Sequence, residues 1–184
     1  MQFADDQSRA LDLDDWSVDQ SSLNELQERV GRFEVDLFAS DGNHRVPRYF
    51  SKMPSDKAMG RDAFLANWAE LGCVFACPAP RDVSAVLRKF AKDGAKGALI
   101  VPRWFSLYGW HLLCEDGRHL NRLVSSAKLI WPHVKKGPHV KSDVFSGISS
   151  FPFLSLGIDA TVARPFQSKV SQDFCVEGGC RGCV

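Results

Sequence analysis

The amino-acid sequence predicts an α/β fold built around an open sheet. Three apolar runs, at residues 33–39, 74–76 and 98–101, have the length and the flanking turn residues of buried strands. Amphipathic patterns with helical spacing, at residues 60–71 and 83–91, separate these runs. Strands that alternate with helices are typical of a mostly parallel sheet, in which ligands bind at the strand ends.

The length and composition favour one domain with a buried core, because 45% of the 184 residues are hydrophobic. No run of about 18 apolar residues occurs, and the first residues are acidic. The sequence therefore predicts neither a membrane span nor a secretory signal. We expect an intracellular protein, in the cytoplasm or the nucleus, without a membrane partner.

Charge divides the chain into two parts. Residues 1–40 hold ten acids and three bases, whereas the remaining residues hold 12 acids and 20 bases. We expect an acidic segment that is separable from a basic body. A basic body attracts polyphosphates such as nucleic acids, although charge dispersed for solubility explains the same balance.

The N-terminal part is expected to hold one helix and one strand. Residues 4–20 are rich in Asp without a clear period, which indicates an irregular connector. Ser22-Leu23-Asn24-Glu25 has the pattern of a capping box, so a helix is predicted from there to about Val30. The strand at residues 33–39 follows, and Ser40-Asp41-Gly42-Asn43 is typical of a turn.

The middle of the chain alternates strands and helices. The basic segment at residues 45–52 is expected to hold a short strand around Tyr49. Residues 60–71 carry bulky apolar side chains at helical spacing, and a strand at residues 74–76 leads into the turn Cys77-Pro78-Ala79-Pro80.

The helix after this turn has the clearest pattern in the chain. Gly94 and Gly97 are expected to stop it before the strand at residues 98–101, which Pro102 closes. Five apolar side chains are predicted to share its buried face: Val83, Val86, Leu87, Phe90 and Ala91.

The C-terminal part is expected to add a short helix within residues 104–114 and two strands, at residues 123–131 and 151–158. A polar stretch at residues 132–150 separates these strands. The tail from residue 160 shows no periodicity.

Two parts of the chain resemble the region downstream of reverse transcriptase and ribonuclease H in DIRS-type (tyrosine-recombinase) retroelements. Ala4-Asp5-Asp6-Gln7-Ser8-Arg9, followed by Asp14-Asp15-Trp16, resembles the end of a retroelement ribonuclease H domain. Residues 35–110 resemble the methyltransferase-like domain of these elements, which is similar to phage DNA adenine N6-methyltransferases. The resemblance implies three parts: a ribonuclease H stub at residues 1–20, a Rossmann-like, methyltransferase-like domain at residues 21–160, and an irregular Cys-rich tail at residues 161–184.

By resemblance to ribonuclease H, Asp5 matches the last of four carboxylates that hold two catalytic divalent metals. The other three would lie upstream of Met1, so we expect no metal site from this chain alone. A solvated acid in a connector is the alternative interpretation of Asp5.

By resemblance to the methyltransferases, the residues Asp36, Phe38, Ala39 and Ser40 fall at the S-adenosylmethionine site. A carboxylate there is suited to the ammonium of the methionine moiety, and small residues admit the cofactor. Asp62 and Phe64 match a further Asp-containing block of these methyltransferases. By this resemblance the Asp62 carboxylate would bind the amino group of the adenine, and the Phe64 ring would stack on the adenine. The alternative is an acid in the first turn of a helix, followed by a core aromatic.

The decisive block of these methyltransferases is Asn/Asp-Pro-Pro-Tyr/Phe, which acts on a flipped adenine. Its first residue accepts a hydrogen bond from the exocyclic amine, and its aromatic ring stacks on the base. The aligned residues here are Cys77, Pro78, Ala79 and Pro80, so only one position of the motif is kept. We therefore expect a degenerate catalytic motif.

Cys77 has two other interpretations. As a nucleophile it needs a nearby base, and His111 and His119 are available in the sequence. A buried, inert thiol is the simpler interpretation, and it also fits Cys73 and Cys114, which lie singly in apolar segments.

Two features lie outside the resemblance. Cys175, Cys180 and Cys183 have part of the spacing of a zinc knuckle, and His133 or His139 is available as a fourth ligand; reduced cysteines in a frayed terminus are the alternative. The basic loop with Lys135, Lys136 and Lys141 is suited to phosphate contacts, and a solvated hairpin tip is the alternative.

The resemblance, together with the changed motif at Cys77–Pro80, implies a fragment of a retroelement polyprotein with a degenerate, non-catalytic DNA adenine methyltransferase-like domain. Such a domain is expected to bind nucleic acid or S-adenosylmethionine weakly, or to scaffold neighbouring polyprotein domains. The alternatives are an active methyltransferase with a drifted motif and a zinc-dependent interaction module.

Overall fold

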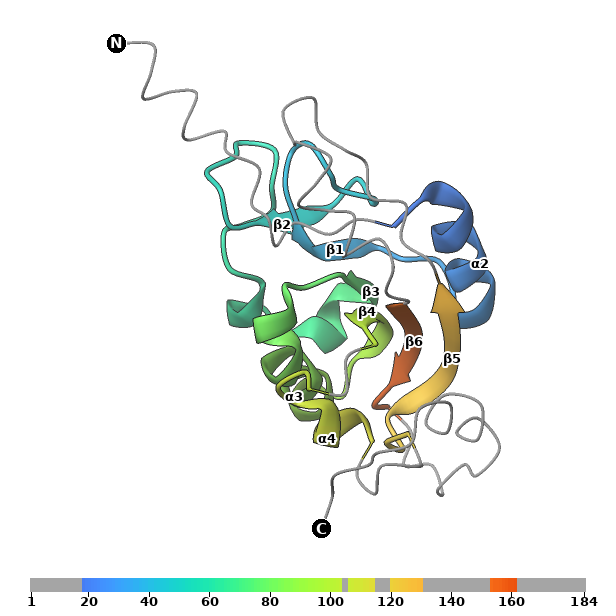
Figure 1. The fold of residues 1–184 in the computed structure, drawn as a ribbon. Coiled ribbons are helices and arrows are strands. Elements are labelled where there is room, and N and C mark those ends of the chain that lie inside the picture. Colours follow the sequence, from blue (N-terminus) through green and yellow to red (C-terminus); the bar gives the residue numbers. More distant parts are fainter. Residues whose placement is uncertain (1–17, 104–105, 115–119, 131–152, 162–184) are drawn as a thin grey trace, which may run out of the picture.

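A single sheet of six strands organises the molecule (Figure 1). The structure is a computed structural model that describes residues 18–103, 106–114, 120–130 and 153–161. The strand order across the sheet is β2-β1-β3-β4-β6-β5. The strands are β1 (Val35–Ala39), β2 (Tyr49–Ser51), β3 (Cys73–Ala76), β4 (Lys96–Pro102), β5 (Val124–Ile130) and β6 (Phe153–Asp159).

The strands β2, β1, β3 and β4 run parallel to one another. β6 is antiparallel to both of its neighbours, β4 and β5. The predicted α/β class with an open sheet is therefore confirmed. The reversed direction of β6 was not predicted, because an apolar run has the same pattern in either strand direction.

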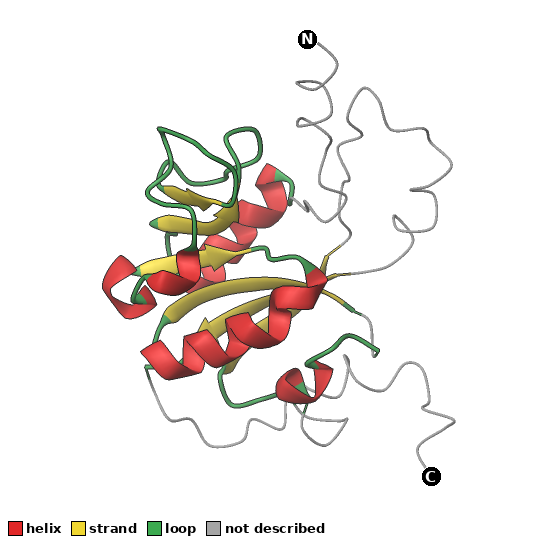
Figure 2. Ribbon diagram, turned by 90° about the vertical axis from the view of Figure 1, so that its left-hand side faces the viewer, coloured by secondary structure: helices red, strands yellow, loops and turns green. Residues whose placement is uncertain are grey.

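Helices cover both faces of the sheet, as the two ribbon views show (Figures 1 and 2). α2 (Gln20–Val30) packs on one face through Leu23, Leu26 and Val30. α3 (Val83–Asp93) and α4 (Trp110–Leu113) lie over the other face. Since both faces are covered, the central strands are buried on both sides, and all seven residues of β6 are buried.

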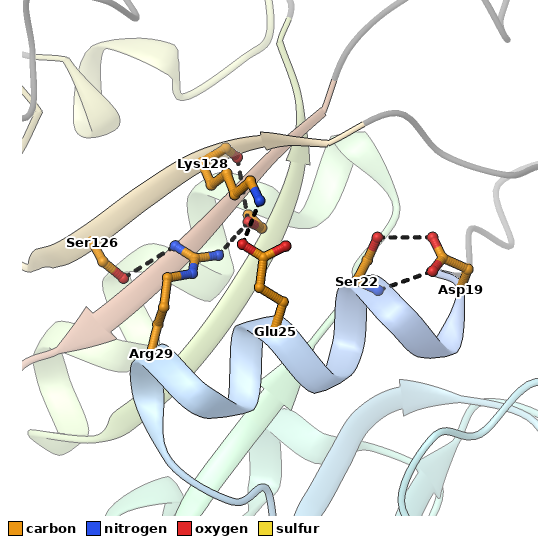
Figure 3. A network of polar contacts seen from close by, with 7 residues as sticks. Asp19, Ser22, Glu25, Arg29, Ser126 and Lys128 are labelled. Atoms are coloured by element: carbon orange, nitrogen blue, oxygen red, sulfur yellow. Dashed lines mark hydrogen bonds and ion pairs between the residues drawn. The ribbon is translucent and has the colours of Figure 1, made fainter.

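α2 begins two residues earlier than predicted. Its N-cap is Asp19, whose Oδ1 accepts a hydrogen bond of 2.9 Å from the backbone N–H of Ser22 (Figure 3). The predicted capping box at Ser22 is therefore wrong. Glu25, which that box needed at the helix start, instead forms an ion pair with Lys128 of β5.

α2 is also attached to the antiparallel end of the sheet. Arg29 Nη2 donates to Ser155 Oγ at 2.6 Å, and Nη1 donates to Ser126 Oγ at 3.4 Å (Figure 3). These contacts join α2 to strands about a hundred residues later in the chain. The helix thereby fixes β5 and β6 relative to the N-terminal half.

The helix predicted at residues 60–71 is instead two short 3₁₀ helices, η1 (Ala63–Leu65) and η2 (Trp68–Leu71). Asp62 and Asn67 cap them, because each side chain accepts a backbone N–H two residues later. Asn67 interrupts the helical pattern, since its local hydrogen bond competes with a continuous helix.

α3 follows the prediction, with a third 3₁₀ turn, η3 (Pro80–Asp82), leading into it. Four of the five expected face residues are buried, but Ala91 is exposed. Gly94 ends the helix in a left-handed conformation, with φ of 65°.

Gly97 does not stop the helix as expected, because it lies inside β4. A Cβ atom at this position would stand 2.0 Å from the backbone oxygen of Val74 in β3. Only glycine therefore allows this close approach of the two strands.

The remaining elements are close to their predicted bounds. α4 occupies four residues of the expected helix at 104–114, and β5 lies within the expected strand at 123–131. β6 begins two residues after the start of the expected strand at 151–158 and ends one residue beyond it, at Asp159. The polar stretch between these strands lies outside the described residues, as does the tail from residue 162.

Trp68 is the largest fully buried side chain among the described residues, and it anchors η2 against α3. Its Nε1 donates to the Ala63 carbonyl at 2.8 Å, and its backbone N–H donates to Asp93 Oδ2 at 2.9 Å. Its ring also makes an edge contact with Phe90, with a centroid distance of 5.1 Å.

We expect Trp68→Ala to lower the free energy of unfolding by about 3–5 kcal/mol, because it leaves a large cavity and removes the hydrogen bond from the indole to the Ala63 carbonyl. Leu65→Ala is the matched control: Leu65 is 86% exposed, so its loss should change stability by about 0.5 kcal/mol or less. Urea unfolding followed by circular dichroism measures both. Equal effects of the two substitutions would contradict this assignment of the core.

Candidate functional site at the carboxyl ends of β1 and β3

The strand order reverses at β1. From β1 the chain first places β2 on one side and then β3 on the other side. The carboxyl ends of β1 and β3 therefore diverge at a topological switch point, where open α/β sheets bind ligands. The sequence-predicted motif Phe38–Ser40 lies at the end of β1, and Cys77–Pro80 follows β3, so the fold brings both motifs to the same edge of the sheet.

The end of β1 is a hydrogen-bonded turn. Asn43 Oδ1 accepts the backbone N–H of Ser40 at 2.6 Å, and the carbonyl of Ser40 accepts the N–H of His44 at 3.1 Å. Ala39 and Ser40 are half-buried here. Two of the predicted cofactor contacts thus lie on a rigid turn at the switch point.

Phe38 and Phe64, both predicted as cofactor contacts, lie against each other, with a ring centroid distance of 5.5 Å. Both rings also contact Trp68, at 6.3 and 5.8 Å. They form a half-buried aromatic wall beside the end of β1. Asp62 is exposed, and its carboxylate accepts the N–H of Phe64 at 2.9 Å, which is the contact of a helix N-cap.

Asp36 lies in the body of β1 rather than at its carboxyl end. The side chain is 3% exposed. Its oxygens accept the backbone N–H groups of Phe38, at 3.4 Å, and of Arg45, at 3.1 Å. These contacts use the carboxylate to hold the loop between β1 and β2, rather than to present it to a ligand.

The pKa of Asp36 is raised to about 6, because burial disfavours its charged form. The hydrogen bonds from Arg45 and Phe38 and the charges of His44 and Arg45 oppose this shift. The carboxyl group of Asp36 therefore changes its charge near pH 6.

The Cys-Pro-Ala-Pro block connects β3 to η3. Cys77 is 7% exposed and packs in the apolar cluster on the α2 face, which includes Phe33, Phe75 and Ile100. Pro78 is also buried, and the Ala79 carbonyl accepts the N–H of Asp82 at 2.9 Å. The block is a rigid turn that contains neither a carboxylate, an amide nor an aromatic ring.

The suggested base His111 is not brought to Cys77. It lies exposed on α4, whose buried residue Leu113 belongs to the cluster on the α3 face. Cys77 belongs to the cluster on the opposite face. A Cys–His pair of these two residues is therefore excluded. The burial expected for Cys77 and Cys114 is confirmed, whereas Cys73, for which burial was also expected, is only half-buried.

Four polar residues of this edge were not singled out from the sequence. Tyr49 Oη donates to Asp41 Oδ1 at 2.6 Å, which closes the turn after β1 onto β2. Lys52 Nζ lies 2.9 Å from Asp82 Oδ2, which joins the end of β2 to the Pro-rich block. Local patterns carry no signal for such pairs, because the partners lie 8 and 30 residues apart.

Several predicted site residues lie outside the described residues: Asp5, Lys135, Lys136, Lys141, Cys175, Cys180 and Cys183, as well as His119, His133 and His139. Within the described ranges, no group of three or more His, Cys, Asp or Glu side chains is arranged to hold a metal ion. Residues 18–103 and the other described parts hold no helix of the length and apolarity needed to cross a membrane. The chain matches no family model and no curated protein.

The raised pKa of Asp36 gives a test of its burial. Between the ordinary Asp pKa and about 6, the folded chain retains a proton that the unfolded chain has released. The stability supplied by this group is therefore complete below that range and is lost as the pH rises through about 6.

We expect the free energy of unfolding of the wild type, relative to Asp36→Asn, to fall by about 2 kcal/mol between about pH 4 and pH 7. Urea unfolding of both proteins over this range measures the difference. The Asn side chain does not titrate, so groups common to both proteins cancel. Parallel pH profiles would show that Asp36 keeps an ordinary pKa.

Proposed function

We propose that the described residues form a Rossmann-like, methyltransferase-type domain that has lost methyl transfer, within a fragment of a retroelement polyprotein. The strand order supports this proposal. Four parallel strands reverse their order at β1, and an antiparallel strand, β6, is inserted before the edge strand β5. An open, mostly parallel sheet with a switch point at β1 fits the Rossmann-like domain that the resemblance implies.

The proposed loss of methyl transfer rests on the Cys-Pro-Ala-Pro block, which follows β3. The position that accepts the adenine amine in the resembled family holds Cys77, whose thiol is a weak acceptor and is buried on the α2 face. Losing one oriented hydrogen bond at a reacting centre costs about 2.7–4 kcal/mol. Losing the stacked ring, here replaced by Pro80, costs about 1–3 kcal/mol more.

The features that suit a cofactor are better kept than the catalytic block. Ala39 and Ser40 form a small-residue turn at the switch point, and Phe38 with Phe64 forms an aromatic wall beside it. Weak binding of S-adenosylmethionine without turnover fits this combination. The remaining role is binding of nucleic acid or scaffolding of neighbouring polyprotein domains, with zinc in the tail as a separate proposal.

We expect no transfer of a labelled methyl group from S-adenosylmethionine to adenine-containing DNA above the level without protein, because no group orients the amine. Titration calorimetry with S-adenosylmethionine measures cofactor binding separately.

The variants Cys77→Ala and Cys114→Ala provide the matched comparison, because both thiols are buried and only Cys77 lies in the motif. The proposal is abandoned if the wild type methylates DNA and Cys77→Ala abolishes this activity while Cys114→Ala retains it. That result would establish an active methyltransferase with a drifted motif.

A further inference from the structure

Positive charge is concentrated along the chain around β2. Residues 43–61, which we call the basic segment, contain five Lys or Arg residues and one acid, Asp56. Among them, Arg48, Lys52, Lys57 and Arg61 have exposed side chains. The segment therefore presents four cations to solvent within a short length of chain.

Few acids compensate these charges. Among the described residues, Arg48 and Arg61 form no ion pair, and Lys52 is paired with Asp82 while its side chain remains 60% exposed. Lys57 acts on Asp41 from a distance, but that carboxylate already accepts the Tyr49 hydroxyl. Most of the positive potential of the segment is thus available to an external anion.

The backbone of the basic segment is fixed in place. Its far end folds back on β2, because Ser51 N–H donates to the Gly60 carbonyl at 3.0 Å and Met59 N–H donates to the Tyr49 carbonyl at 2.8 Å. The ring of His44 stacks on Tyr49 with a centroid distance of 4.4 Å. Binding an anion here therefore costs little ordering of the main chain.

The position of the segment connects it to the candidate site. It leaves the carboxyl end of β1, contains β2, and is joined to η3 by the ion pair of Lys52 with Asp82. The exposed cations thus border the edge of the sheet where the Cys-Pro-Ala-Pro block lies. Met53 and Met59, 56% and 43% exposed, add apolar surface on the same segment.

We propose that the basic segment binds the phosphate backbone of a nucleic acid without reading its sequence, through Arg48, Lys57 and Arg61. This inference deepens the proposed function, since it rests on a nucleic-acid partner and locates where that partner lies. Lys and Arg side chains bind phosphates by releasing condensed counterions, so the affinity depends on salt rather than on base identity. An anionic membrane is disfavoured, because the segment contains no amphipathic helix.

The test measures binding of the full chain to a fluorescein-labelled, mixed-sequence single-stranded DNA by fluorescence anisotropy over a series of salt concentrations. We expect Arg48→Gln/Lys57→Gln/Arg61→Gln to reduce the slope of log K against log salt by about 2. That change corresponds to roughly a hundredfold weaker binding at about 0.1 M salt.

The control is Arg32→Gln/Arg88→Gln/Lys92→Gln, which removes the same charge from exposed positions on α3 and on the α2–β1 connection. We expect this control to keep most of the wild-type slope. Urea unfolding verifies that both variants are folded. A third variant, Lys135→Gln/Lys136→Gln/Lys141→Gln, tests whether the basic loop predicted from the sequence carries the binding instead.

The proposal is overturned if the wild type does not bind DNA at low salt, if the basic-segment variant and the control lose equal affinity, or if only the third variant loses it. Binding to phosphatidylserine vesicles, with the same dependence on Arg48, Lys57 and Arg61 and without DNA binding, overturns it in favour of a membrane. Methyl transfer and S-adenosylmethionine binding do not use these residues. The assays of methyl transfer and of S-adenosylmethionine binding therefore test the proposed function separately.

Discussion

Coverage of the sheet on both faces is the constraint on which the rest of the structure depends. α2 packs on one face and α3 on the other, so the central strands have apolar side chains on both sides. Most polar side chains that could contact a ligand therefore lie at the ends of the strands. Asp36 is an exception: it is buried within β1 and is accommodated by two backbone N–H groups and a raised pKa.

The same constraint bears on the proposed change of a catalytic motif. Cys77 and Pro78 are buried parts of the connection between β3 and η3, and Cys77 adds to the apolar packing against α2. A small apolar side chain at that position suits the core, whereas a polar acceptor would need a partner or exposure to solvent. The proposed loss of methyl transfer is therefore compatible with an intact sheet.

The edge of the sheet near β1 and β2 combines fixed loops with exposed positive charge. Its loops are held by specific polar contacts, such as Tyr49 with Asp41, while its cations remain exposed. Exposed cations in a fixed loop repel one another, and they attract an external anion. Their place beside the Cys-Pro-Ala-Pro block is compatible with the proposed binding of nucleic acid without methyl transfer.

The sequence alone was sufficient to predict the α/β class, the strands that lie in the core and the amphipathic helix α3, because apolar periodicity reports burial directly. It also indicated which motifs follow β1 and β3. The direction of β6, the 3₁₀ geometry near Trp68 and the capping of α2 by Asp19 were decided by tertiary contacts. So were the burial of Asp36 and the pairing of Lys52 with Asp82. These features depend on groups far apart in the chain, and their energies arise only when packing excludes water between them.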